Sequence, residues 1–275
     1  MTTEADLADP IMTFEALGPG RWRLDADPKW CNPGGGLWGG YDIGVAIGMD
    51  KHMPGAFSAD PVQYALPSWY GETGLFLTPK FFAMKIQRYM HDFGASSEDF
   101  GRVTVAGRRM AARNPKAWFY QKPITLADHQ ASRWIVEPLR LLDCCQESDG
   151  AVAIVVTRAD RARHLQQRPV LIRGAAQGAC DDQMNMTSFY RKDISALSEM
   201  RLVAKQLYAM SGLGPNDIQT AVLYDHFSPF VLPQLEAFDF CKRGEAKDFI
   251  KDGNLDRGGR LPVNTHGGQL GEAYI

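Results

Sequence analysis

The chain has 275 residues, of which 45% are hydrophobic and 23% charged, with a formal net charge of −2. A chain this apolar can bury a substantial core, which excludes intrinsic disorder, and its near-neutral charge gives no general attraction to nucleic acid. The longest uninterrupted apolar run, 151–156, is far shorter than the ~20 residues of a membrane span. The first ten residues carry three acids and no apolar stretch, so we expect a cytoplasmic globular protein without a secretory signal.

The first 58 residues differ in character from the rest. Glycines at 34–36 and 39–40 flank Leu37 and Trp38, and an apolar stretch with helical character follows at 41–49. Glycine permits backbone conformations that other residues resist. Two interpretations stay open, a flexible loop before a core helix and a functional loop.

From residue 59 onward the pattern predicts helices that alternate with strands. The predicted helices span 81–93, 96–114 and 192–213, and a further helix begins near Pro229. Short β-branched runs at 151–157, 169–172 and 218–224 predict buried strands. Such alternation favours an α/β fold built in layers.

The last fifteen residues, 261–275, predict a strand end that enters a glycine loop and should lead into a helix. That helix would follow residue 275, and without it an apolar layer stays uncovered. We therefore expect a fragment, or one half of a structure that is assembled with another chain.

The chain has five cysteines, an odd number, which predicts reduced thiols rather than a disulfide framework. Cys144 and Cys145 are adjacent, and no CxxC or HxxxH pattern accompanies them. We expect no metal site and thiols that are buried or chemically idle.

The first candidate constellation is Tyr224-Asp225-His226, at the end of a predicted buried strand. Ligands bind at the carboxyl ends of strands in layered α/β folds. An imidazole that titrates near neutrality, oriented by a neighbouring carboxylate, can move protons. The alternative is a buried polar cluster that satisfies backbone groups.

The second constellation is the glycine loop, with Asn264, His266, Gly267, Gly268 and then Tyr274. Paired glycines let backbone amides approach a thioester oxygen or a phosphate. Taken alone this is a weak signal, because most glycine-rich turns are only turns.

A third feature is basic. No acid occurs between positions 99 and 128, while Arg109 and Arg113 lie there beside Trp118. Basic groups next to aromatic rings suit a phosphate-bearing nucleotide such as coenzyme A, and RNA would use the same residues. The alternative is a solvated helix face.

Three stretches together resemble the thiolase superfamily, in its sterol-carrier-type, lipid-transfer-protein branch. They are 138–151 (PLRLLDCCQESDGA), 224–227 (YDHF) and 264–268 (NTHGG) with Tyr274. The resemblance covers residues 59–275 and implies a layered α-β-α fold that lacks its N-terminal half and its last layer. It divides into a helical and loop cap region at 59–130 and a truncated C-terminal domain at 131–275.

Two departures from the family pattern shape the expected chemistry. The family has catalytic histidines where this chain has Tyr224 and Tyr274, and none of the five cysteines lies in a nucleophile motif. Acyl transfer needs such a thiolate. The pattern is similar instead to thiolase-like lipid-transfer proteins that act as retro-aldolases in steroid side-chain breakdown. These split a β-hydroxyacyl-CoA into a ketone and a shorter acyl-CoA.

On this resemblance Tyr224 and Tyr274 are the expected acid and base, with Asp225 and His226 beside them. One phenol would need its anion stabilised, by His226 or by amides of the glycine loop. Asn264, His266, Gly267, Gly268, Arg109, Arg113 and Trp118 are the expected substrate and CoA contacts. Coenzyme A would be part of the substrate, and no separate cofactor is expected.

The resemblance also implies an OB-fold partner protein and a homodimer or hetero-oligomer. Residues 1–58, with LGPGRWR at 17–23 and PGGGLWGG at 33–40, resemble the start of a hot-dog-fold acyl-CoA thioesterase. The alternatives that stay open are acyl transfer by a thiolase reaction, a thioesterase, and an acyl-CoA-binding or lipid-binding fragment without catalysis.

Overall fold

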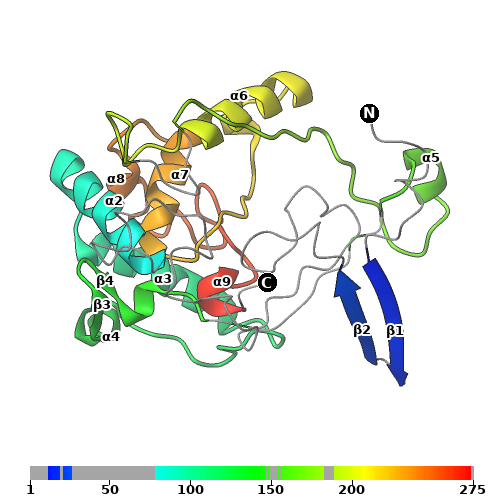
Figure 1. Ribbon diagram of the computed structural model, residues 1–275, viewed down its shortest axis with the longest axis horizontal. Coiled ribbons are helices and arrows are strands. Elements are labelled where there is room, and N and C mark those ends of the chain that lie inside the picture. The colour runs from blue at the N-terminus through cyan, green and yellow to red at the C-terminus, as the bar shows by residue number, and fades with distance from the viewer. Residues whose placement is uncertain are drawn as a thin grey trace. The chain divides into compact units, whose positions relative to one another are not determined.

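The computed structural model describes residues 12–18, 21–26, 78–146, 148, 154, 156–182 and 189–273. The chain divides into two compact units (Figure 1). Unit 1 comprises Met1–Phe76, Asp149–Val156 and Ile275, and unit 2 comprises Leu77–Ser148 and Thr157–Tyr274. The predicted boundaries at residues 58 and 130 stay predictions.

Unit 1 contributes one antiparallel hairpin, in which β1 (Met12–Gly18) pairs with β2 (Arg21–Ala26). Met12 lies opposite Ala26, and the register shifts between Ala16 and Gly18. The predicted glycine loop at 33–40 and the apolar stretch at 41–49 lie outside the described residues.

Unit 2 is mainly helical. Its first two helices lie where the sequence predicted them. Helix α2 (Thr78–Phe93) buries Phe82, Ile86 and Tyr89, which recur at the three- and four-residue spacing of a single helix face. Gly94 ends it with a left-handed backbone, and its amide donates to the Met90 carbonyl at 2.8 Å.

Helix α3 (Ser97–Ala111) begins at a capping interaction. The Asp99 carboxylate accepts a hydrogen bond from the Ser96 amide at 2.8 Å, which satisfies a donor that the helix leaves free. The helix ends at Ala111, three residues before the predicted stop at Asn114. A second capping interaction, between Thr125 and Asp128, opens α4 (Leu126–Ala131).

The short elements that follow complete the unit. They are β3 (Trp134–Val136), β4 (Leu139–Arg140), η4 (Leu141–Asp143), α5 (Ala159–Ala162), α6 (Ser198–Ser211), η5 (Pro215–Asp217), η6 (Ser228–Phe230), α7 (Val231–Ala237), α8 (Ala246–Phe249) and α9 (Gly268–Gly271). Helix α6 begins six residues later than predicted. The Asp193 carboxylate accepts from the amides of Ser195 and Ala196, so this stretch forms a local turn before the helix.

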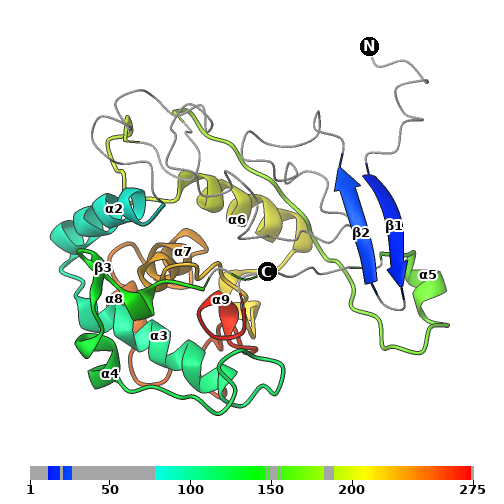
Figure 2. The ribbon, with the colours of Figure 1, turned by 60° about the horizontal axis from the view of Figure 1, so that its bottom comes forward.

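Helix α7 lies in the middle of unit 2, between α6 and α3 (Figure 2). All seven of its residues are buried, as expected for a central helix with Val231, Leu232 and Leu235 in the core. A neighbouring cluster joins Phe82, Phe227 and Phe230. The segment that carries Tyr224 therefore runs between two apolar clusters.

The predicted strands fare differently from the helices. The 169–172 stretch has no regular structure, and Val170 is 93% exposed, because no neighbouring strand pairs with it within the described part of the chain. Of 218–224, only Ala221 forms a bridge, parallel to Val263. Most of 151–157 lies outside the described residues.

None of the described helices is long and apolar enough to traverse a bilayer.

Candidate active site

The backbone of the Tyr224 segment is held by two side-chain amides. The Asn264 amide accepts from the Leu223 N–H at 2.8 Å and donates to the Leu223 carbonyl at 2.9 Å. One residue later, Gln234 accepts from the Tyr224 N–H at 3.1 Å and donates to its carbonyl at 2.6 Å. Side chains thus take the place of strand neighbours at this point.

The rings of Tyr224 and His226 lie stacked, with centroids 4.2 Å apart and planes 18° apart. Phe82 and Phe230 meet the imidazole edge-on at 4.6 Å and 4.9 Å. His226 is only 3% exposed, and among the described residues neither ring nitrogen has a hydrogen-bond partner.

Burial lowers the pKa of His226 to about 3, so the imidazole is neutral at pH 7. A neutral ring supplies no positive charge to a neighbouring phenolate. The neutral state of the imidazole therefore does not support the expectation that His226 stabilises a tyrosine anion by charge.

Asp225 connects the Tyr224 segment to the glycine loop. Its carboxylate accepts from the amides of Gln269 at 2.8 Å and Leu270 at 3.4 Å, in the first turn of α9. Burial raises the pKa of Asp225, and these amide hydrogen bonds oppose the rise. A Cβ built on Gly268 would overlap this carboxylate, so the loop needs glycine there.

The glycine loop also packs against the end of α3. A Cβ on Gly267 would lie 2.8 Å from the Ala111 Cβ, and the Gly267 amide donates to the Asn264 carbonyl at 2.8 Å. This amide is therefore engaged within the loop. The His266 imidazole lies 3.7 Å from the Glu272 carboxylate. The main-chain carbonyl of His266 accepts a hydrogen bond from the Asn114 side chain at 2.9 Å.

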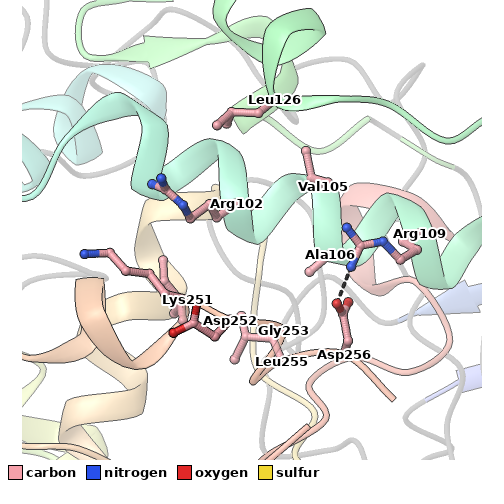
Figure 3. A pocket seen from close by; sticks show the side chains of 11 residues that line it. Arg102, Val105, Ala106, Arg109, Leu126, Lys251, Asp252, Gly253, Leu255 and Asp256 are labelled. Atoms are coloured by element: carbon pink, nitrogen blue, oxygen red, sulfur yellow. Dashed lines mark hydrogen bonds and ion pairs between the residues drawn. The ribbon is translucent and has the colours of Figure 1, made fainter. Parts of the chain in front are cut away.

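The basic and aromatic candidates divide between two places. The Trp118 amide donates to the Glu272 carbonyl at 2.9 Å, which sets Trp118 beside the glycine loop with its side chain 67% exposed. Arg113 is exposed. Arg109 instead pairs with Asp256 and lines a hollow of about 160 Å³ between α3 and the 250–256 loop (Figure 3).

The structure thus brings Tyr224, Asp225, His226, Asn264, Gly267 and Gly268 into one region, with His266 and Trp118 beside it. Tyr274 lies outside the described residues, so its distance from Tyr224 stays a prediction. No group of three or more His, Cys, Asp or Glu side chains in the described segments is arranged to bind a metal ion.

The sequence did not predict a buried polar network around Asp143, close to the Tyr224 segment. The fully buried Asp143 accepts from His129 Nε2 at 2.7 Å, from the Ser228 hydroxyl, and from the Arg140 amide at 2.8 Å. The Cys145 amide also donates to the His226 carbonyl at 2.9 Å. These contacts fix the far end of the Tyr224 segment.

Gln234 was missed as well. A signal for it exists, because it is the single amide within an otherwise apolar helix start, FVLPQL at 230–235. A buried amide in such a setting needs partners, and they are the backbone groups of Tyr224. Asp143 lies within the 138–151 motif, but its partners His129 and Ser228 are 14 and 85 residues away in sequence.

Residues 178–274 match the family model of the thiolase C-terminal domain-like family. The chain is 64% identical over 217 residues to a steroid side-chain-cleaving aldolase of Thermomonospora curvata, covering 79% of this chain and 55% of that protein. It is 68% identical over 193 residues to a 17-hydroxy-3-oxo-4-pregnene-20-carboxyl-CoA lyase of Mycobacterium tuberculosis, covering 70% of this chain and 50% of the lyase. The chain thus spans about half the length of the curated relatives it matches.

Two solved structures are similar as well. The Ltp2-ChsH2(DUF35) aldolase matches with a TM-score of 0.75 and 64% identity, covering 79% of this chain and 56% of that one. A monomeric SCP2-thiolase-like protein type 1 from Mycobacterium smegmatis matches with a TM-score of 0.50 and 20% identity, covering 71% of this chain and 41% of that one, which bears on the fold alone.

The matched part of this chain is therefore similar to thiolase-superfamily proteins in sequence and in fold, as its motifs predicted. Its sequence is similar to the steroid side-chain-cleaving aldolase and to the 17-hydroxy-3-oxo-4-pregnene-20-carboxyl-CoA lyase, and its fold is similar to the SCP2-thiolase-like protein. The resemblance of residues 1–58 to a thioesterase stays a prediction.

Proposed function

We propose that this chain acts as a retro-aldolase on a β-hydroxyacyl-CoA whose acyl group is a steroid side chain. The observation that carries the proposal is the 64–68% identity to two proteins named for this cleavage. In the substrate named for the lyase, the 17-hydroxyl is β to the thioester carbonyl, as a retro-aldol reaction requires.

The proposed step balances as follows. A base takes the proton of the β-hydroxyl, the oxygen forms a ketone, and the bond between the α and β carbons breaks. The electron pair of that bond passes to the α carbon as a thioester enolate, which then takes a proton from an acid. The products are a ketone and an acyl-CoA shortened by the departing ring system.

Tyr224 and Tyr274 are the proposed base and acid, since phenols can serve both roles. Trp118 and Arg113, exposed near the glycine loop, are the proposed contacts of the CoA moiety. Arg109 is paired with Asp256, so an anionic ligand would compete with this carboxylate. Coenzyme A enters as part of the substrate.

Acyl transfer through a cysteine is less well supported. Burial raises the pKa of the Cys144 and Cys241 thiols to about 12, so neither is a thiolate at neutral pH. We also propose a hetero-oligomer with a DUF35-type, OB-fold partner, which the description of the Ltp2-ChsH2(DUF35) aldolase supports.

The test is turnover of a 17-hydroxy-steroid carboxyl-CoA by the full chain, mixed with a DUF35-type protein, with ketone and acyl-CoA followed by mass spectrometry. We expect Tyr224→Phe and Tyr274→Phe each to lower kcat by about 100-fold or more, the usual contribution of an acid or a base. Tyr120→Phe, at an exposed position, is the control and should keep wild-type kcat.

Absence of ketone from the wild-type chain with its partner would reject the proposed cleavage. Undiminished turnover in the Tyr224→Phe, Tyr274→Phe double variant would reject the roles of the two phenols. Binding of the acyl-CoA without turnover would indicate an acyl-CoA-binding protein instead.

A further inference from the structure

Gln234 is a buried amide that the proposed reaction does not use directly. It lies in α7, is 2% exposed, and is surrounded in sequence by Leu232, Pro233 and Leu235. Placing an amide in such a position is costly unless its donors and acceptor are all satisfied.

The partners of Gln234 explain its position. Its Oε1 accepts from the Tyr224 N–H, and its Nε2 donates both to the Tyr224 carbonyl and to the Phe230 carbonyl at 3.0 Å. Both main-chain groups of Tyr224 are therefore bound to one side chain. The hydrogen bond to the Phe230 carbonyl connects the same amide to Phe230, whose ring meets the His226 imidazole edge-on.

These contacts constrain where the Tyr224 ring can lie. The Tyr224 backbone is held by Gln234, and its ring packs against His226 on one face and meets Phe230 edge-on at 6.3 Å. Gln234 holds the Tyr224 backbone directly. It also binds the backbone carbonyl of Phe230, whose ring meets the Tyr224 ring. A catalytic group displaced by about 1 Å can lose roughly 100-fold in rate.

We propose that Gln234 is a positioning residue, whose amide fixes the main chain of Tyr224 so that its phenol meets the β-hydroxyl of the substrate. The inference rests on the proposed function. It assigns to Gln234 a role through Tyr224 and no contact with substrate.

Gln234→Met tests the amide at similar length, and Gln234→Glu tests it at the same shape. A carboxylate at 234 would face the Tyr224 carbonyl and repel it, whereas a protonated carboxyl would restore one donor and one acceptor. Asn254→Leu is the matched control, since Asn254 donates a similar bond to the Phe249 carbonyl at 2.8 Å without touching Tyr224.

We expect Gln234→Met to lower kcat 30- to 100-fold with KM within twofold of wild type. For Gln234→Glu, kcat relative to wild type should rise at least fivefold from pH 8 to pH 5.5. Hydrogen exchange at the Tyr224 amide should accelerate at least tenfold in Gln234→Met, and Asn254→Leu should change neither kcat nor this exchange rate.

Wild-type kcat in Gln234→Met, or a Gln234→Glu activity ratio that does not change with pH, would overturn the positioning role. A wild-type chain without turnover would instead reject the proposed function. The exchange measurement needs no substrate, so unaltered exchange at Tyr224 in Gln234→Met overturns the inference in either case.

Discussion

His226 shows how a residue chosen for its chemistry can be defined by its surroundings. Sequence alone places an imidazole beside a carboxylate, an arrangement typical of proton transfer. In the structure the Asp225 carboxylate binds α9 amides, and the imidazole packs among aromatic rings. The Asp225 carboxylate, which could have stabilised a protonated His226, accepts hydrogen bonds from α9 amides instead.

The lowered pKa of His226 predicts a pH-dependent stability. Below a pH of about 6.5 the unfolded chain binds a proton on this imidazole, while the folded ring stays neutral down to about pH 3. Its contribution to the free energy of unfolding is therefore present above pH 6.5 and is lost as the pH falls toward 3. The slope it adds is at most about 1.4 kcal/mol per pH unit.

Urea unfolding of His226→Phe at pH 6, 5 and 4 measures this contribution. The free energy of unfolding should fall less steeply with decreasing pH in the variant than in the wild type. His164→Asn is the control, because His164 is exposed, and its slope should match the wild type. Parallel slopes for wild type and His226→Phe would contradict the assigned burial of a neutral ring.

At the scale of elements, the contact between the Tyr224 segment and α9 depends on one missing side chain. Gly268 has a φ of +66° and lies directly against the Asp225 carboxylate. Gly212, which ends α6, has nearly the same φ of +69°, but a Cβ built on it would have open space around it. A comparison of alanine substitutions at the two glycines therefore distinguishes the cost of backbone strain from the cost of steric overlap.

Gly268→Ala and Gly212→Ala should therefore differ in cost. Both pay for a left-handed alanine, which costs roughly 1–2 kcal/mol. Gly268→Ala should cost about 1–3 kcal/mol more, because the Asp225 carboxylate must move away from the α9 amides. Thermal unfolding monitored by circular dichroism measures both, and equal losses would show that Asp225 can relocate freely.

At the scale of the whole molecule, the longer helices could be predicted from sequence, whereas most of the short helices and the pairing of strands could not. The apolar spacing in α2, the Ser96 cap of α3 and Gly212 at the end of α6 are local signals that act within one turn. A strand needs a neighbour, and 169–172 has none among the described residues. Its β-branched composition alone could not show this.

The candidate site follows the same division. Tyr224, Asp225 and Asn264 were identified from their motifs, and the structure places them together. The roles of Gln234 and Asp143 were not predicted, because Gln234 binds a carbonyl 10 residues away and Asp143 binds a hydroxyl 85 residues away in sequence. Single polar contacts of this kind leave no periodic pattern in the sequence.

The unpaired stretch at 169–172 has a measurable consequence. Its exposed apolar residues lie between Arg163 and Arg173, which are also exposed. Limited trypsin digestion should cleave after these arginines before it cleaves after the buried Arg108 of α3. Mass spectrometry of the first fragments checks this, and early cleavage after Arg108 would contradict its burial.

The hydrogen bonds by which two side-chain amides hold Leu223 and Tyr224 reach only the main-chain atoms of those two residues. Any amino acid with a free N–H could occupy position 224 and receive the same anchorage, whatever its side chain. A scaffold built in this way can exchange an imidazole for a phenol without rebuilding its frame. The reaction chemistry of such a protein can change by substitution at one position, while the geometry that aims the new group is inherited intact.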